Sequence, residues 1–230
     1  MKTIGLIGGM SWESSAEYYR ILNEEVKNRL SGLHSAKCIL FSVDFAEIER
    51  YQVAGDWETA GKVLTDAAQS LEKAGADMIV LCTNTMHKVI DYIEEQVNLP
   101  ILHIADATAT QIQQAGISKV GLLGTKYTME QDFYKSRIAS MGITVLIPNQ
   151  EDREVINRVI FEELCLGNIQ QSSREYYKKV IQLLVDEGAE GIILGCTEIG
   201  LLVKPEDADV PLFDTTIIHA IEAVNRALEG

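Results

Sequence analysis

The chain repeats one strand-like segment, and this repeat constrains the fold more than any other feature of the sequence. The first copy, residues 75–85, reads GADMIVLCTNT, and the second, residues 188–198, reads GAEGIILGCTE. When the Gly-Ala pairs are aligned, the apolar runs superpose and Thr83 falls opposite Cys196. Short, nearly continuous apolar runs are typical of strands that helices cover on both faces of a parallel sheet. The repeat therefore predicts two matching halves, each with a polar residue at the end of a buried strand.

The repeat extends to other parts of the chain. Residues 4–8 match residues 120–124, and residues 71–75 match residues 184–188, so that a predicted helix ends at glycine in each half. Apolar strand candidates alternate with amphipathic stretches, which indicates βαβ units and parallel sheets. The strand candidates are residues 3–7, 37–43, 78–81, 101–104, 119–123, 143–147 and 191–194.

These patterns predict an α/β protein with two pseudosymmetric, doubly wound lobes and parallel sheets. The first lobe is predicted to cover residues 1–113 plus 212–230, and the second to cover residues 114–211. Two similar βα units within one continuous sheet are the alternative. Because open α/β sheets bind ligands beyond the carboxyl ends of their strands, the active site is predicted in the cleft between the lobes.

Composition excludes several kinds of partner. The formal charge of −14, from 34 acidic and 20 basic residues, repels phosphate backbones and anionic membranes, so neither nucleic acid nor a membrane is an expected partner. The cysteines Cys38, Cys82, Cys165 and Cys196 form no CxxC pair, which favours reduced thiols in a cytoplasmic protein. The apolar stretch at the start of the chain is too short for a signal peptide or a membrane span.

The residues that could take part in a reaction lie at the ends of the strands. Thr83, Asn84 and Thr85 offer hydroxyl and amide groups that can bind a carboxylate or an amino group, and a helix cap is the alternative interpretation. At the matching position, a thiol beside a helix N-terminus is expected to have a lowered pKa, so Cys196 is a candidate acid–base group. A buried core cysteine is the alternative there. Strand alternation predicts that Cys82 is a core thiol.

The glycine-rich start and the histidines argue against common cofactors. The segment after Gly5 lacks the GxGxxG spacing, so a dinucleotide is not expected, while Ser11 is placed to cap the following helix. The four histidines do not have metal-ligand spacing, so no metal site is predicted. His87 follows Thr83 by one helical turn, where it could polarise a group of the site.

At these residues the chain resembles the aspartate/glutamate racemase family over essentially its whole length. The resemblance rests on residues 8–10, 83–87, 124–125 and 194–198, and it is closest to the L-aspartate/glutamate-specific or broad-specificity amino-acid racemases. It implies an enzyme without PLP or any other cofactor, in which two lobes enclose an amino-acid substrate. One lobe removes the α-proton and the other delivers a proton to the opposite face. Most members use two cysteines, whereas this chain has Thr83 at the first position.

The resemblance also implies roles for individual residues. Thr83 and Cys196 would be the catalytic pair, and a homodimer is a possible assembly. Because a threonine hydroxyl is a much weaker acid than a thiol, unequal activity in the two directions is expected. The substrate-binding residues would be Asn84, Thr85, Thr125 and Thr197 at the α-carboxylate and amino group, with Met10 and Gln52 at the side-chain pocket.

The predicted function is therefore a PLP-independent racemase of aspartate, glutamate or a broader range of amino acids. The uncharged Gln52 fits a wider range of side chains than a cation would, which leaves the substrate open. Two alternatives remain at this point. One is a related carbanion enzyme, such as a malonate-type decarboxylase or a maleate isomerase, and the other is a non-catalytic amino-acid-binding protein.

Overall fold

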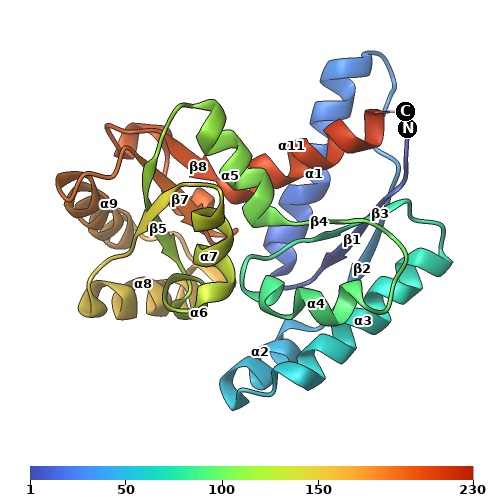
Figure 1. Ribbon diagram of the computed structural model, residues 1–230, viewed down its shortest axis with the longest axis horizontal. Coiled ribbons are helices and arrows are strands. Elements are labelled where there is room, and N and C mark those ends of the chain that lie inside the picture. Colours follow the sequence, from blue (N-terminus) through green and yellow to red (C-terminus); the bar gives the residue numbers. More distant parts are fainter. Residues whose placement is uncertain (230) are drawn as a thin grey trace. The chain divides into compact units, whose positions relative to one another are not determined.

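The computed structural model describes residues 1–229 and contains two four-stranded parallel sheets (Figure 1). The strand order is β2-β1-β3-β4 in the first sheet and β6-β5-β7-β8 in the second. The four strands of each half, numbered along the chain, thus occupy the same positions in their sheet. This confirms the predicted pair of similar α/β halves. The strands are β1 (Ile4–Gly8), β2 (Cys38–Ser42), β3 (Met78–Leu81), β4 (Ile101–Leu102), β5 (Lys119–Gly124), β6 (Thr144–Leu146), β7 (Gly191–Gly195) and β8 (Leu212–Asp214).

Helices connect successive strands and cover the sheets (Figure 1). Three of the helical segments, the η elements, are short 3₁₀ turns. The helices are α1 (Trp12–Leu30), α2 (Phe45–Ala54), α3 (Trp57–Lys73), η1 (Thr85–Val89), α4 (Ile90–Glu94), α5 (Ile104–Gln114), α6 (Lys126–Glu130), α7 (Asp132–Ser140), α8 (Gln150–Glu162), η2 (Leu164–Leu166), α9 (Gln171–Asp186), α10 (Ile199–Leu202), η3 (Pro205–Asp207) and α11 (Thr215–Leu228).

The central strands of the first sheet are buried on both faces. Along β3, Met78 and Val80 pack into the core beneath α1 and α11, whereas Ile79 and Leu81 pack into the core beneath α3 and α4. Cys82 follows the same alternation, joins the first of these cores and has no exposed surface. The prediction that Cys82 is a core thiol is therefore confirmed. Burial raises the pKa of this thiol, which makes it unreactive.

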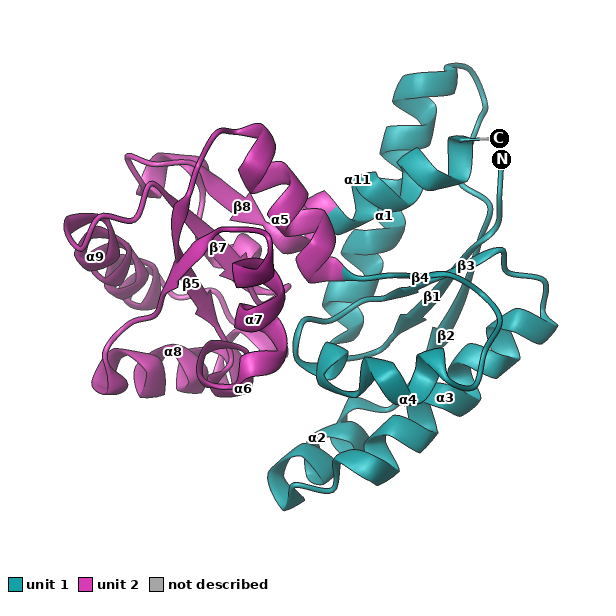
Figure 2. Cartoon of the chain, viewed as in Figure 1, with its two compact units in different colours: residues 1–103, 219–230 teal, residues 104–218 magenta. Residues whose placement is uncertain are grey.

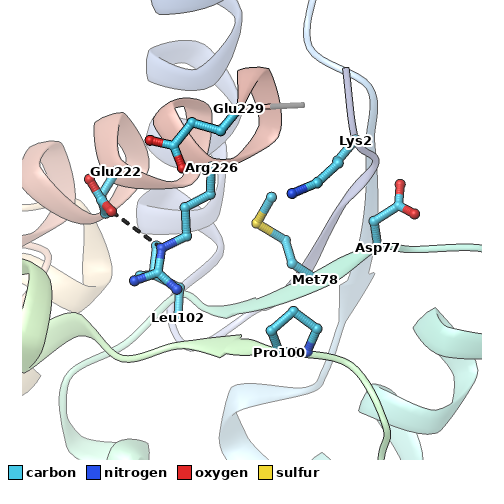
Figure 3. A pocket seen from close by; sticks show the side chains of 8 residues that line it. All are labelled: Lys2, Asp77, Met78, Pro100, Leu102, Glu222, Arg226 and Glu229. Atoms are coloured by element: carbon cyan, nitrogen blue, oxygen red, sulfur yellow. Dashed lines mark hydrogen bonds and ion pairs between the residues drawn. The ribbon is translucent and has the colours of Figure 1, made fainter.

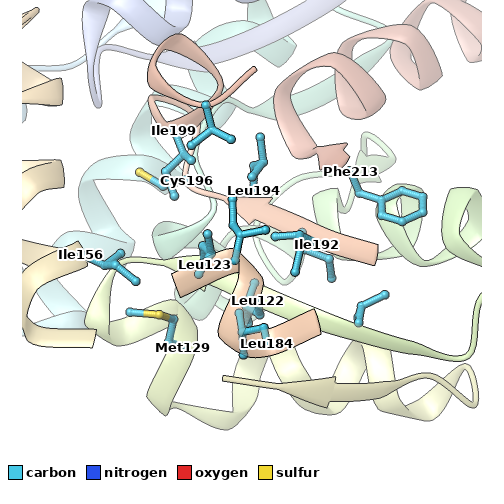
Figure 4. Packing of buried hydrophobic residues seen from close by; sticks show 14 of the residues in the cluster. Leu122, Leu123, Met129, Ile156, Leu184, Ile192, Leu194, Cys196, Ile199 and Phe213 are labelled. Carbon is cyan, nitrogen blue, oxygen red and sulfur yellow. The ribbon is translucent and has the colours of Figure 1, made fainter. Parts of the chain in front are cut away.

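The second sheet has one core that encloses its central strands β5 and β7. Leu122 and Leu123 point to opposite sides of β5, and both are fully buried in this core. Figure 4 shows part of the cluster, with Cys196 next to Ile199 at its edge. The core therefore ends where the polar residues after β7 begin.

The chain divides into two compact units, coloured separately in Figure 2. Unit 1 consists of Met1–His103 and His219–Gly230, and unit 2 consists of Ile104–Ile218. The boundaries predicted from the sequence lie after residues 113 and 211 instead. The difference concerns α5 and β8: β8 pairs with β7 of the second sheet, so residues 212–214 belong with that sheet.

Two glycines end corresponding helices, as the sequence analysis predicted. Gly75 follows α3 with φ of +90°, and Gly188 follows α9 with φ of +94°. In each case the next amide bonds back to the last turn: the N–H of Ala76 donates to Leu71 O, and that of Ala189 donates to Leu184 O. Glycine reaches this backbone conformation without steric cost, which allows the helix to stop and the next strand to begin.

Candidate active site

The loop after β3 carries three buried polar residues in succession. Thr83, Asn84 and Thr85 are exposed by only 7%, 2% and 6%. His87 lies in the following 3₁₀ turn, and its Nδ1 donates a hydrogen bond of 2.7 Å to the carbonyl oxygen of Thr83. The carbonyl can only accept, so Nδ1 carries the proton. His87 thus fixes the backbone at Thr83.

Two further predicted site residues lie against the same loop. Gln52 comes from α2, is buried, and its Nε2 lies 3.0 Å from the sulfur of Met86. Met10, from the loop after β1, belongs to the same apolar cluster as Met86. Since β1 and β3 are neighbours in the sheet, their carboxyl ends lie side by side. Unit 1 therefore brings Met10 and Gln52 together with the loop that begins at Thr83.

Behind this loop lies a buried cluster of aromatic and histidine side chains. The rings of His87 and His103 are 4.4 Å apart, and those of His87 and His219 are 5.9 Å apart. His219 bonds through Nε2 to Leu102 O at 2.9 Å and through Nδ1 to the hydroxyl of Tyr18 at 2.8 Å. Burial, with a contribution from His87, lowers the pKa of His219 to about 3, so this ring is neutral at physiological pH.

In unit 2, the predicted site residues lie at two adjacent strand ends. Gly124 of β5 pairs with Gly195 of β7, so the next residues, Thr125 and Cys196, leave the sheet side by side. Thr125 is buried and caps α6, because its Oγ1 accepts the N–H of Thr128 at 3.3 Å. The predicted site residues are therefore grouped within each unit.

A carboxylate holds the hydroxyl and thiol that follow β7. Oε2 of Glu198 accepts hydrogen bonds from Cys196 Sγ at 3.0 Å and from Thr197 Oγ1 at 2.9 Å. Glu198 is only 2% exposed, and Cys196 only 7%. The thiol is therefore protonated and donates a hydrogen bond to the carboxylate.

The predicted lowering of the Cys196 pKa is wrong. Burial raises the pKa of this thiol well above its ordinary value, and the negative charge of Glu198 raises it further. Sequence reasoning considered the helix N-terminus but did not assign a role to Glu198. The only available signal was its position two residues after the thiol, which does not show that the side chain turns back towards the sulfur.

Comparison with known proteins identifies the family of this chain. The family model for Asp/Glu/Hydantoin racemases matches residues 7–223. The chain belongs to this family. The resemblance noted from the sequence is thereby confirmed, and membership of a racemase family supports an isomerase.

Individual relatives in this racemase family have similar sequences and folds. A broad specificity amino-acid racemase of Bacillus subtilis (strain 168) is 25% identical over 173 residues, 75% of this chain and 74% of the relative. The crystal structure of a proposed Asp/Glu racemase from Yersinia pestis is 60% identical, with a TM-score of 0.93 over 100% of both chains. An aspartate racemase homologue from Pyrococcus horikoshii OT3 is 40% identical, with a TM-score of 0.86 over 100% of both chains.

The structure was also searched for a metal site, a membrane-spanning helix and a cavity. Within residues 1–229, no group of three or more His, Cys, Asp or Glu residues could hold a metal ion. No helix in the same part of the chain is long and apolar enough to cross a membrane. Unit 1 also has a cavity of about 490 Å³, in which Met78 lies between Lys2 and Arg226 (Figure 3). This cavity is at the amino end of β3, whereas Thr83 follows the carboxyl end of that strand.

Proposed function

We propose that this protein is a PLP-independent amino-acid racemase in which Cys196 and Thr83 act on opposite faces of the α-carbon. One observation carries the proposal. Thr83 and Cys196 follow the corresponding strands β3 and β7 of two sheets that have the same strand order. Racemisation requires a base on one face and an acid on the other, and a duplicated scaffold supplies one group for each face.

Glu198 gives Cys196 a route to its basic form. The thiol proton passes to Oε2 of Glu198, 3.0 Å away, and the thiolate then removes the α-proton of the substrate. The positive α-ammonium group of a bound amino acid lowers the pKa of a nearby thiol, which opposes the effects of burial and of Glu198. The α-proton ends on the sulfur, and its electron pair remains on the α-carbon.

Thr83 completes the reaction on the other face. Its hydroxyl donates a proton to the carbanion, and the alkoxide that results is reprotonated from solvent, to which Glu198 releases its own proton. Because an alkoxide is a costly species near neutral pH, Thr83 removes an α-proton more slowly than Cys196 does. The rates of α-proton exchange with solvent are therefore expected to differ between the two enantiomers, whereas kcat/KM for racemisation is equal in both directions because the equilibrium constant is one.

Neutral polar groups are proposed to bind the substrate. The hydroxyl and amide groups of Asn84, Thr85, Thr125 and Thr197 contact the α-carboxylate and the amino group. Met10 and Gln52 line the side-chain pocket. Gln52 supplies an amide rather than a charge, so the substrates include aspartate, glutamate and neutral amino acids of similar size. All six residues are buried, and five of them have polar side chains, which supports this proposal because ligand sites are enclosed and orient the ligand through a few polar groups.

The test is hydrogen exchange at the α-carbon. L-aspartate, L-glutamate, a panel of neutral amino acids and their D-enantiomers are incubated with the protein in D₂O and followed by proton NMR. We expect loss of the α-proton signal with at least one substrate, and loss of this activity in Cys196→Ala. Cys38→Ala, which removes a thiol at the amino end of β2, is the matched control. Absence of exchange with every substrate would contradict the proposal.

A malonate-type decarboxylase is the second candidate. Decarboxylation generates the carbanion without a base, so it needs only one proton donor. The protonated thiol of Cys196 and the absence of a thiol at residue 83 are consistent with that chemistry. Release of CO₂ from substituted malonates, together with no α-proton exchange in amino acids, would favour this candidate over the racemase.

A further inference from the structure

Three of the four histidines of this chain lie in one buried cluster of unit 1, next to the loop that begins at Thr83. They are His87, His103 and His219, and all three are buried. Histidine is usually only partly buried, and an apolar side chain would fill the same space without losing contact with water. Packing alone therefore does not account for the cluster.

Hydrogen bonds fix the positions of the protons on His219. The carbonyl oxygen of Leu102 can only accept, so Nε2 of His219, 2.9 Å away, carries a proton. The ring is neutral, so Nδ1 has a lone pair and accepts the hydroxyl proton of Tyr18 at 2.8 Å. Tyr18 lies on α1 and Leu102 on β4. A helix and a strand of unit 1 thus determine the orientation of this ring together.

The ring of His219 in turn packs against that of His87. Their centroids are 5.9 Å apart and their planes are at 63°, an edge-to-face arrangement. The ring of His103 also packs on His87, at 4.4 Å. Nδ1 of His87 donates to the carbonyl oxygen of Thr83 at 2.7 Å, while the N–H of Thr83 donates to Leu81 O at 2.9 Å. Both backbone polar groups of Thr83 are therefore held, one of them by the histidine cluster.

The same cluster contains the residues at which the chain leaves and re-enters unit 1. His103 is the last residue before the chain passes to unit 2, and His219 is the first residue after it returns. Each of these two rings contacts the ring of His87. The position of Thr83 therefore depends on residues far from it in the sequence.

We propose that Tyr18 and His219 are positioning residues for Thr83, which act through His87 and control proton transfer at one face of the substrate. This inference rests on the racemase function proposed above. Proton transfer requires the hydroxyl of Thr83 to lie within hydrogen-bond distance of the reacting atom. A displacement of about 1 Å can lower the rate by about 100-fold, so the orientation of the loop matters as much as the presence of the hydroxyl.

The other face of the substrate provides an internal control. Cys196 is held by its own hydrogen bond to Glu198, so removal of a proton by the thiol should not depend on the cluster. In D₂O, the exchange of a single enantiomer reports on the group that removes its α-proton, and the slower enantiomer is the one that Thr83 deprotonates. A defect in the cluster should therefore slow this enantiomer alone, whereas a general loss of folded protein would slow both.

The first test replaces His87 and follows the α-proton exchange of each enantiomer by proton NMR. His87→Leu should slow the slower enantiomer by about 100-fold and leave the faster one within about twofold of wild type. His87→Asn should restore most of the lost rate, because its amide nitrogen is attached to Cγ, as Nδ1 is, and can donate to Thr83. Circular dichroism establishes that the variants fold. Equal losses for both enantiomers, or an Asn variant as slow as the Leu variant, would overturn the proposal.

The second test removes a single oxygen atom from the far end of the network. Tyr18→Phe keeps the ring but loses the hydrogen bond to His219, so the slower enantiomer should lose about fivefold in rate and the faster one should not change. Tyr134→Phe is the matched control, because Tyr134 is a fully buried tyrosine of α7 in unit 2. An unchanged slower rate in Tyr18→Phe, or an equal loss in the control, would overturn the role of Tyr18.

A third measurement does not depend on activity. Nitrogen-15 NMR of protein with labelled histidine identifies which ring nitrogens carry protons. We expect a proton on Nδ1 of His87 and on Nε2 of His219, and the absence of either proton would overturn the network. A wild-type protein that exchanges neither enantiomer would overturn the racemase function together with this inference. An active wild type with variants that slow both enantiomers equally would overturn the inference alone.

Discussion

At the scale of single residues, Cys196 and Glu198 form a buried pair of a thiol and a carboxylate. The carboxylate is almost completely buried, and its Oε2 accepts from both a thiol and a hydroxyl. A buried carboxylate is costly unless hydrogen-bond donors compensate it. The thiol gains an acceptor, and the carboxylate gains two donors, so the pair stores one transferable proton beside the proposed reaction site.

Replacing Glu198 with Gln should make Cys196 more acidic but less active. Removal of the negative charge is expected to lower the pKa of the thiol. Loss of the proton acceptor should reduce turnover by roughly 100-fold. The pKa is measured from the pH dependence of iodoacetamide labelling at Cys196, quantified by mass spectrometry. Glu206→Gln, at a side chain 70% exposed, is the matched control, and an unchanged labelling profile in Glu198→Gln would count against the pair.

His219 should make the protein sensitive to acid. Its pKa is about 3 when folded, compared with about 6.5 when unfolded, so the unfolded chain binds more protons between these values. The free energy of unfolding therefore falls as the pH decreases below about 6.5. His219→Gln should reduce this slope by up to about 1.4 kcal/mol per pH unit. Urea denaturation between pH 7 and pH 4 measures the slope.

The comparison for this prediction is His34→Gln, because His34 is an exposed histidine. Substitution of His219 also removes hydrogen bonds to Tyr18 and Leu102, so the slopes must be compared rather than the stabilities at one pH. Equal slopes in wild type and His219→Gln would show that another group controls the acid response.

Sequence patterns are sufficient to select the candidate residues, but they do not predict the hydrogen bonds and burial that set the pKa of those residues. The repeat identified Thr83 and Cys196, because the ends of buried strands can be recognised from local apolar runs. The predicted direction of the Cys196 pKa shift was wrong, since the shift depends on the rotamer of Glu198 and on the near-complete burial of the thiol, neither of which is encoded in spacing. The contact of His87 with the Thr83 carbonyl agrees with the predicted helical turn, because it depends on residues close in sequence.

At the scale of the elements, β8 is the strand that the sequence analysis missed. Leu212–Asp214 is only three residues long and follows Pro211, so the apolar run is too short to distinguish from a loop. Its pairing with β7 is a tertiary contact. Conversely, the run at residues 101–104 was too long for a strand, because α5 already begins at Ile104. Short edge strands depend on their neighbours more than on their own composition.

The loop between β1 and α1 has one position where only glycine fits. Gly9 has φ of +95°, and a Cβ atom there would lie 2.2 Å from the carbonyl oxygen of Val43. Gly9→Ala should therefore destabilise the protein by at least about 3 kcal/mol, from backbone strain and steric overlap together. Urea denaturation measures this change in the free energy of unfolding.

Gly32 provides the matched control for that substitution. It has φ of +63°, but a Cβ atom there would have no heavy atom within 4 Å. Gly32→Ala should cost only about 1–2 kcal/mol, because strain is the sole contribution. Similar losses in the two variants would mean that the Val43 loop moves away at little cost.

At the scale of the whole molecule, each unit contributes one group to the proposed reaction. Thr83 belongs to unit 1 and Cys196 to unit 2, at corresponding strand ends. Thr83→Cys makes the two groups chemically alike. It should bring the exchange rates of the L- and D-enantiomers in D₂O closer together, by roughly tenfold or more, because a thiolate is far more accessible than an alkoxide.

Thr85→Cys is the control for this substitution, since it adds a thiol to the same loop at a residue proposed to bind substrate rather than transfer a proton. Cys196→Ala in the Thr83→Cys background should remain inactive in racemisation. An unchanged ratio of the two exchange rates in Thr83→Cys would show that residue 83 does not transfer the proton.

The chain returns to unit 1 at His219, within α11, and this has a consequence for the order in which the protein can fold during synthesis. Ala220, Ala223 and Val224 of this last helix complete the core that contains Ile4 and Leu6 of the first strand. A ribosome makes unit 2 between these two parts, so unit 2 can fold while unit 1 still lacks one side of its core. The nascent first unit is therefore expected to expose apolar surface until α11 emerges.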